Sequence, residues 1–352
     1  MKRDAGAKTF EERNKIRAKL TKFRSLAGAL LSKKKKGVYT EKALQYTTMM
    51  LKRQPDFHTI WNYRRDILNS LLSDATETKR NTYLKSEFEI VEYVLSLPLS
   101  FSLSLSISIS SLLSITQQHT RTQHNNSYGL STKNPKSYSL WHHRRWTVSK
   151  HIEWMEKSSS EILKQELELC KKFLKHDERN FHCWNYRGFL VSKLGMSDEE
   201  NLKFTKEKVM ENFSNYSALH RRMRLFTKQS EVKNEEELEE ILSSEIEMIK
   251  HSIFTEPDDQ SPWLYLRWMM ELAAKRLSSN AVDKEIRSII ECCHVICEEE
   301  KVEMKWPLLT EFQMLRLCSD HSDDDERRCR EILKVLCEID SNHKGYYEEH
   351  LK

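Results

Sequence analysis

Apolar and polar residues follow each other along most of this chain with the period of an amphipathic α-helix, and one pattern recurs at long intervals. In each copy a Trp or Leu is followed by two polar or aromatic residues, then by Arg three or four residues after the Trp or Leu, and then by an apolar run. The copies are TIWNYRRDIL at Trp61, SLWHHRRWTV at Trp141, HCWNYRGFLV at Trp184, SALHRRMRLF at Leu219 and SPWLYLRWMM at Trp263. A weaker sixth copy, KWPLLTEFQMLRL, surrounds Trp306. Such recurrence predicts a helical repeat protein.

A second helical pattern and a short turn precede each copy, as in LELCKKFLKHDERN before Trp184 and IEMIKHSIFTEPDDQ before Trp263. Residues 134–135, 177–178 and 256–258 offer turn and N-cap chemistry between the two helices. We therefore predict an all-α fold in which antiparallel helical hairpins bury each other's apolar faces. The Trp side chains should pack inside the hairpins, and the Arg heads should cap carbonyl groups of a neighbouring helix.

One stretch interrupts the regular spacing. Successive Trp or Leu positions from 141 to 306 are 43, 35, 44 and 43 residues apart, whereas positions 61 and 141 are 80 apart. An ordinary period of 44 leaves 36 surplus residues, which is the length of the segment 96–131. We predict a single helical-repeat domain over residues 1–352, interrupted at 96–131. The segment begins SLPLSFSLSLSISISSLLSI, and we interpret it as low-complexity sequence or translated non-coding sequence, with a membrane span and an exposed strand as alternatives.

Composition narrows the class further. Only 7 Gly and 6 Pro occur in 352 residues, which favours helices over tight turns. The net charge of +5 comes from 58 basic and 53 acidic residues, so bulk charge does not favour nucleic-acid binding. The start of the chain has no apolar signal segment and the eight cysteines lack a repeated CxxC spacing, which favours a reduced, cytoplasmic protein. The cluster ECCHVICEE places Cys293 and Cys297 near apolar Ile residues, so we interpret it as packing rather than as a metal site.

With the repeats in view, the chain resembles the alpha subunits of protein prenyltransferases, whose helical hairpins carry this Trp-x-x-Arg pattern. Within that family, NPKSYSLWHHRRW, DERNFHCWNYR, NFSNYSALHRR and EPDDQSPWLYLRWMM are closest to the Rab geranylgeranyltransferase (type II) alpha subunits. The resemblance covers residues 8–352 apart from the insertion. It implies a right-handed, crescent-shaped array, resembling a tetratricopeptide superhelix, that wraps around a separate beta subunit.

The resemblance also implies the chemistry. The beta subunit would hold the catalytic zinc and most of the isoprenoid pocket, and zinc would keep the substrate cysteine as thiolate for attack on geranylgeranyl diphosphate. Rab GTPases, delivered by a Rab escort protein, would be the substrates. The alpha subunit would lend a cation to the leaving diphosphate.

Four residues match the family's site motifs. Lys136 matches the diphosphate-facing lysine and Tyr138 its aromatic neighbour, while Asn180 and His182 match the next repeat's loop at the mouth of the active site. His142 and His143 are expected to serve in packing or in an interface rather than as catalytic bases.

Three other functions remain open at this stage. The chain could be the alpha subunit shared by farnesyl and type I geranylgeranyl transferases, a tetratricopeptide-like peptide-binding scaffold, or a helical-repeat RNA reader. The spacing of 43 or 44 residues and the Trp-x-x-Arg signature disfavour the scaffold, and the near-balanced charge disfavours the RNA reader. No leucine-rich repeat spacing follows the last hairpin, so the chain is either a compact form or a truncated one.

Overall fold

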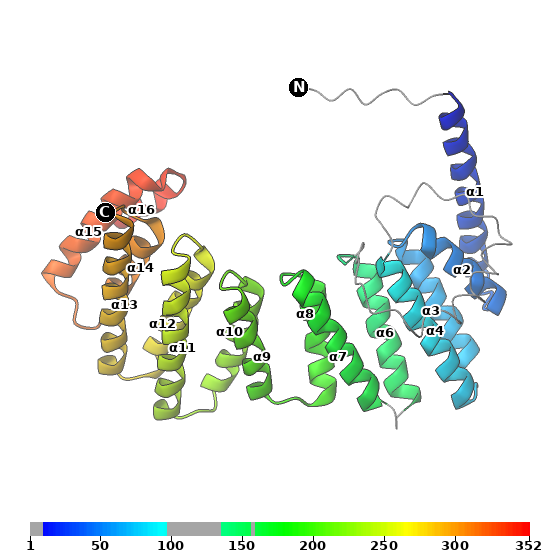
Figure 1. Ribbon diagram of the computed structural model, residues 1–352, viewed down its shortest axis with the longest axis horizontal. Helices are drawn as coiled ribbons and strands as arrows, with labels where there is room; N and C mark the ends of the chain where they lie inside the picture. Colours follow the sequence, from blue (N-terminus) through cyan, green and yellow to red (C-terminus); the bar gives the residue numbers. More distant parts are fainter. Residues whose placement is uncertain (1–9, 97–134, 156–158) are drawn as a thin grey trace. The chain divides into compact units, whose positions relative to one another are not determined.

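The computed structural model describes residues 10–96, 135–155 and 159–352, and within these ranges all regular secondary structure is helical. The predicted all-α fold built from antiparallel hairpins is confirmed (Figure 1). The chain forms two compact units, one of residues 1–176 and 180–194 and the other of residues 177–179 and 195–352. The predicted insertion at 96–131 lies, apart from Ser96, outside the described residues, as does the membrane-span alternative for it.

The first unit pairs α2 with α3, α4 with α6, and α7 with α8, and α1 packs beside α2. Its helices are α1 (Phe10–Lys35), α2 (Glu41–Arg53), α3 (His58–Leu72), α4 (Glu77–Ser96), α6 (Tyr138–Trp154), α7 (Ser159–His176) and α8 (Phe181–Leu194).

The second unit continues the same pairing, α9 with α10, α11 with α12, α13 with α14, and α15 with α16. Its elements are α9 (Asp198–Glu211), α10 (Tyr216–Ser230), α11 (Glu235–Thr255), α12 (Gln260–Arg276), α13 (Ser279–Glu300), α14 (Lys305–Leu317), α15 (Asp323–Ile339), the short 3-10 helix η3 (Ser341–His343) and α16 (Lys344–His350).

The Trp residues of the four strong copies are buried, as predicted, whereas Trp306 of the weaker copy is half-buried. The structure explains why Trp recurs. In three hairpins the indole Nε1 donates to a Pro carbonyl six residues earlier, in the turn before the helix. The pairs are Trp61 with Pro55 at 2.7 Å, Trp141 with Pro135 at 2.8 Å, and Trp263 with Pro257 at 2.9 Å. The ring therefore fills the interface while its one polar atom is satisfied by the turn.

Three arginines of the motif lie in the core, and each of them binds a Glu on the first helix of the next hairpin. Arg64 Nε and Nη2 donate to Glu87 at 2.6 Å each, and Arg144 donates in the same two-pronged way to Glu166. Arg222 repeats the arrangement with Glu245 in the second unit.

A third side chain completes each cluster, and it comes from the second helix of the hairpin that carries the Glu. We call each such set a bridging triad. The three triads are Arg64–Glu87–His143, Arg144–Glu166–Tyr186 and Arg222–Glu245–Tyr265. Because all members are buried, each triad satisfies polar groups that would otherwise be costly in the core.

The predicted role of the Arg heads is confirmed in part. Arg64 Nη1 donates to the carbonyl of Leu44 on the preceding helix at 3.1 Å, and Arg222 Nη1 does so to Leu202 at 2.6 Å. The carboxylate partners were not predicted. The guanidinium therefore joins three helices, since its other edge binds the Glu of the following hairpin.

The triads measure the interruption independently of the Trp spacing. From the Glu to the third member there are 20 residues in the two regular triads, Glu166 to Tyr186 and Glu245 to Tyr265. From Glu87 to His143 there are 56. The excess is 36 residues, equal to the surplus inferred from the sequence.

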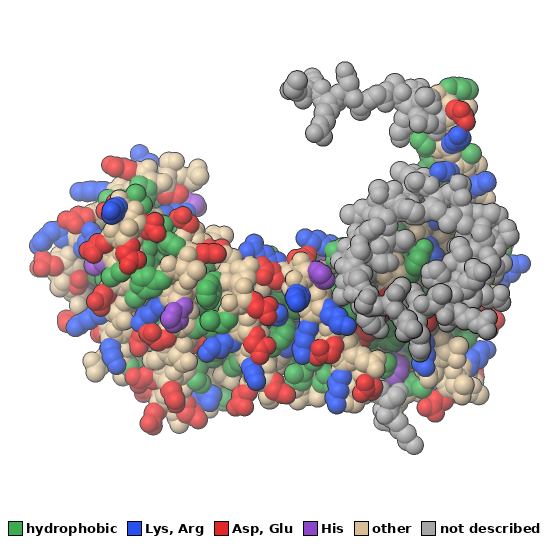
Figure 2. Space-filling model, in the orientation of Figure 1, with side chains coloured by type: hydrophobic (Ala, Val, Ile, Leu, Met, Phe, Trp, Pro, Cys, Tyr) green, Lys and Arg blue, Asp and Glu red, His purple; other side chains and the backbone are tan. Residues whose placement is uncertain are grey.

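Surface and cysteine chemistry agree with the composition. Acidic and basic side chains are interspersed over the face shown in Figure 2, and no described helix is long and apolar enough to span a membrane.

Cys293 is buried between Ile289 and Ile296, and burial raises the pKa of its thiol well above the ordinary value. The predicted packing role of Cys293 is confirmed, whereas its neighbour His294 bonds to Glu311 at 2.9 Å.

Candidate functional site

Three segments of the first unit contact one another in series. They are the turn before α3, the 135–139 loop, and Asn180 at the start of α8. The 135–139 loop, which opens α6, is fastened to the preceding turn through two side-chain contacts. Ser137 Oγ donates to Asp56 Oδ1 at 2.5 Å, and Ser139 Oγ lies 2.7 Å from His58 Nδ1. The position of the loop is thus set by the start of α3.

The same loop is fastened to the following turn by Asn180. Its Nδ2 donates to the Pro135 carbonyl at 2.9 Å, which also accepts from Trp141. Its Oδ1 accepts from the backbone N–H groups of His182 and Cys183, both at 3.1 Å, and so caps α8. Asn180 is 2% exposed, and its role in the structure is to tie the two loops together.

Aromatic rings surround the loop on its exposed side. Tyr138 and Phe181 are 64% and 46% exposed, and their ring centroids are 5.6 Å apart. The His182 ring lies against both, 4.2 Å from Tyr138 in an edge-to-face arrangement and 3.9 Å from Phe181. Exposed aromatic rings next to a buried imidazole provide a surface suited to an apolar or charged partner.

His182 connects this aromatic group to Lys136. Burial lowers the pKa of His182, and a hydrogen bond to the backbone of Lys136 acts in the opposite direction. Nε2 of His182 is buried without a partner among the described residues, so the bond to the backbone is made by Nδ1. The imidazole is therefore neutral near pH 7, with Nδ1–H donating to the loop and Nε2 left as an acceptor.

The structure brings the four predicted site residues together. Lys136 is exposed in the turn before α6, Tyr138 is exposed beside it, and Asn180 and His182 lie beneath them. Phe181 belongs to the same group and was missed. Its signal in the sequence was an aromatic residue three positions before the repeat's Trp or Leu, since Tyr138, Phe181 and Tyr216 share that position.

The two neighbouring histidines of α6 take different positions. His143 is fully buried against Trp61, with ring centroids 4.5 Å apart, so its predicted packing role is confirmed. His142 is exposed. Among the residues that the structure describes, no group of three or more His, Cys, Asp or Glu side chains has the arrangement of a metal site.

Comparison with known proteins agrees with this geometry. The protein prenyltransferase alpha subunit repeat matches residues 40–71, 128–151, 163–194 and 242–273. Four segments of this chain are prenyltransferase alpha subunit repeats. Three of the matched segments fall on the hairpins of Trp61, Trp184 and Trp263, and the segment 128–151 includes α6 with Trp141. The α9–α10 and α13–α14 pairs show that the chain also forms helical hairpins at Leu219 and Trp306.

Two relatives that match most of this chain carry the same name. The geranylgeranyl transferase type-2 subunit alpha of Rattus norvegicus is 31% identical over 301 residues, covering 84% of this chain and 42% of the rat protein. The subunit of the same name from Saccharomyces cerevisiae is 28% identical over 344 residues, covering 94% of this chain and 90% of the yeast protein. The chain thus spans less than half the length of the mammalian relatives and most of the yeast relative.

A solved structure supports the fold. Candida albicans protein geranylgeranyltransferase-I complexed with GGPP matches 94% of this chain and 90% of its own chain with a TM-score of 0.63. The sequence identity is 19%, so this likeness establishes the shared architecture and not the substrate.

Proposed function

We propose that this chain is the alpha subunit of a heterodimeric Rab geranylgeranyltransferase, which transfers geranylgeranyl from geranylgeranyl diphosphate to C-terminal cysteines of Rab GTPases in the cytoplasm. Two findings support the proposal. The named relatives over most of the chain are type-2 alpha subunits. Lys136, Tyr138, Asn180 and His182, which match the family's site motifs, converge on neighbouring turns.

The observation that carries the proposal is the way the 135–139 loop presents Lys136. The loop is fixed on one side by Asp56 and His58 and on the other by Asn180 and His182. An ammonium group held on such a fixed loop is preorganised to stabilise negative charge that develops on a leaving diphosphate. His182 is a positioning residue in this account, because its neutral imidazole holds the loop through Nδ1.

The remaining chemistry belongs to the partner. A beta subunit would supply the zinc, which keeps the substrate cysteine as a thiolate, and most of the lipid pocket. A Rab escort protein would present the GTPase. This chain contributes the cation of Lys136 and the aromatic surface formed by Tyr138 and Phe181.

Reconstitution tests the proposal. The chain would be co-expressed with a type II beta subunit, and transfer of labelled geranylgeranyl to a Rab protein presented by its escort would be measured. Parallel reactions would offer farnesyl diphosphate with a C-terminal peptide acceptor. We expect transfer of geranylgeranyl to the Rab protein.

The other outcomes separate the alternatives. Transfer to the peptide acceptor but not to the Rab protein would assign the chain to the farnesyl and type I enzymes. A stable complex without transfer to either acceptor would contradict an enzymatic role and favour a scaffold.

A further inference from the structure

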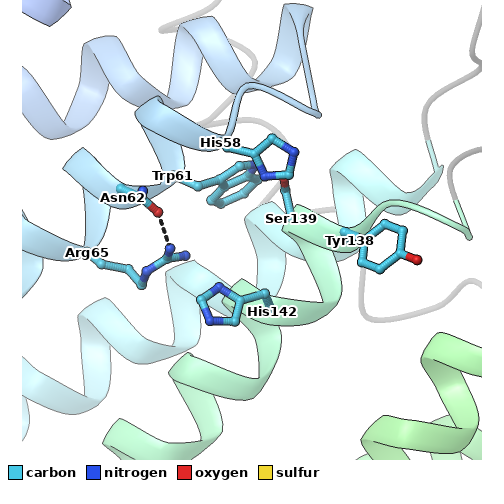
Figure 3. A pocket seen from close by; sticks show the side chains of 7 residues that line it. All are labelled: His58, Trp61, Asn62, Arg65, Tyr138, Ser139 and His142. Atoms are coloured by element: carbon cyan, nitrogen blue, oxygen red, sulfur yellow. Dashed lines mark hydrogen bonds between the residues drawn. The ribbon is translucent and has the colours of Figure 1, made fainter.

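A second group of basic and aromatic side chains surrounds a cavity next to the 135–139 loop. The cavity has a volume of about 270 Å³ and lies between the start of α3 and the start of α6 (Figure 3). Its lining is His58, Trp61, Asn62, Arg65, Tyr138, Ser139 and His142. No carboxylate is among these residues.

Arg65 is the centre of the site. Its Nη2 donates to Asn62 Oδ1 at 2.5 Å, whereas its Nη1 is buried and has no partner in the described part of the chain. Asp66 is the negative charge that acts on Arg65, and its Oδ2 lies 3.6 Å from Nζ of Lys34. A buried guanidinium N–H without an acceptor is costly, and a bound anion would satisfy it.

His58 and His142 each add an imidazole N–H that can donate to the same anion. His142 lies across the cavity from Asn62 and Arg65 in Figure 3, and His58 lies near Trp61 and Ser139. Burial lowers the pKa of His142, and the positive charges of Arg65, Arg145 and His58 lower it further. Positive potential therefore converges on the cavity from α3 and α6, and an entering anion would reduce this repulsion.

We propose that this cavity is a phosphoryl-binding site, which takes inorganic phosphate or the diphosphate group, free or as the head of a prenyl diphosphate. A phosphoryl group carries several acceptor oxygens and can receive bonds from Arg65 and from both imidazoles at once. The volume leaves room for a diphosphate with water. The site is distinct from Lys136, although Tyr138 borders both.

Titration calorimetry on the full chain tests the proposal without any transferase reaction. The probes are inorganic phosphate, inorganic diphosphate and the short lipid geranyl diphosphate. Wild-type protein should bind inorganic diphosphate, and Arg65→Gln should weaken that binding by about tenfold or more, the effect of losing one charge-assisted contact.

A matched variant and a stability measurement complete the test. Arg224→Gln removes an exposed arginine from the equivalent helix of another hairpin, α10, and should leave binding unchanged. Melting temperatures of all variants should agree, which separates lost binding from lost fold. Geranyl diphosphate binding as well as inorganic diphosphate would identify the lipid head as a source, and binding of the inorganic ions alone would identify the free anion.

Three results would overturn the site. They are no binding of phosphate or diphosphate by the wild type, unchanged affinity in Arg65→Gln, and an equal loss of affinity in Arg224→Gln. None of these results depends on whether the chain supports geranylgeranyl transfer, so the two proposals fail separately.

Discussion

Lys136 is exposed on a loop whose anchors come from neighbouring segments of the first unit. We expect Lys136→Ala to lower turnover in the reconstituted heterodimer by about 100-fold, the effect of losing one group that stabilises developing negative charge. Copurification of the two subunits should be unaffected. The exposed Lys203→Ala on α9 is the control and should keep full turnover. Wild-type turnover in Lys136→Ala would remove this residue from the mechanism.

His143 makes the first triad sensitive to acid. Burial lowers the pKa of His143 to about 4 from 6.5, although its bond to Glu87 opposes the change. Burial alone would raise the pKa of Glu87, but the charge of Arg64 and the bonds from His143 and Arg64 lower it from 4.5 to about 2. The unfolded chain therefore binds more protons than the folded one, first at His143 and then at Glu87, as the pH falls.

The free energy of unfolding should accordingly decrease as the pH is lowered from 7 towards 4. His143→Gln keeps a donor for Glu87 but does not titrate, so its stability should fall less over that range. Urea unfolding at several pH values, followed by circular dichroism, measures the difference. His220→Gln, at an exposed site on α10, should behave as the wild type does. Equal slopes for wild type and His143→Gln would show that the triad does not sense acid in this window.

At this scale the sequence predicted which positions matter better than what they contact. The burial of Trp141 was predicted from its place in the repeat, whereas the role of Lys136 stays a prediction. The partner of Arg144 was not, because Glu166 lies 22 residues further on and the contact depends on how one hairpin meets the next. Arg65 was missed because nothing in its sequence context distinguishes a solvated arginine from one whose Nη1 is buried.

The helix α7 carries two glutamates whose substitution compares the contribution of a bridging triad to the free energy of unfolding with that of a surface ion pair. Glu166 is buried and binds Arg144 and Tyr186, whereas Glu168, two residues later, is 60% exposed and pairs with Lys171. Glu166→Gln should reduce the free energy of unfolding by about 3–5 kcal/mol, since it leaves the buried guanidinium of Arg144 with only the exposed carboxylate of Glu92, 3.4 Å away, as a counter-ion.

Glu168→Gln is the matched control and should change stability by no more than about 0.5 kcal/mol. Urea unfolding of both variants gives the comparison. A similar small effect for the two would mean that Arg144 finds another acceptor or that water enters the core.

Helical elements were the most predictable level. The hairpins and the turns at residues 135–136, 178–179 and 257–258 agree with the expected pattern. The residues that cap the helices lie just after the turn segments predicted from sequence. Asn180 caps α8 and follows the predicted segment 177–178, and Asp259 caps α12 and follows the predicted segment 256–258. A cap is fixed by backbone geometry, which apolar periodicity does not report.

At the scale of the whole molecule, we expect that the interruption between α4 and α6 can be deleted if the deletion leaves the normal number of residues between the Glu and the third member of the first triad. Deleting residues 96–131 restores the spacing of 20 residues between Glu87 and His143 that the other triads have. We expect a folded protein with equal or slightly higher stability, because a doubling of loop length costs only about 0.6 kcal/mol. Deleting 96–133 instead removes two further residues and should destabilise the first unit.

Thermal unfolding followed by circular dichroism compares the two deletions with the full chain. Equal melting temperatures for both deletions would contradict the register argument. A large loss with the deletion of 96–131 would mean that the segment contributes to the fold.

The repeat count and the length of the interruption were available from the Trp spacing, because a helical array buries its core between neighbours and so keeps a regular period. The single domain expected over residues 1–352 stays a prediction, and so do the handedness and curvature of the array. Contacts divide the chain into two compact units near residue 194, inside the short interval of 35 residues between Trp184 and Leu219.

The bridging triads also bear on how such a chain could have grown. Each hairpin with a triad glutamate brings that carboxylate and its Tyr or His, and the Arg comes from the hairpin before it. A gene duplication that copies a whole hairpin with its Arg, Glu and aromatic residue would therefore create a complete new bridge at the junction. Exchange of a single helix would instead leave a guanidinium in the core without its carboxylate. Whole hairpins are thus the natural units of recombination in this protein.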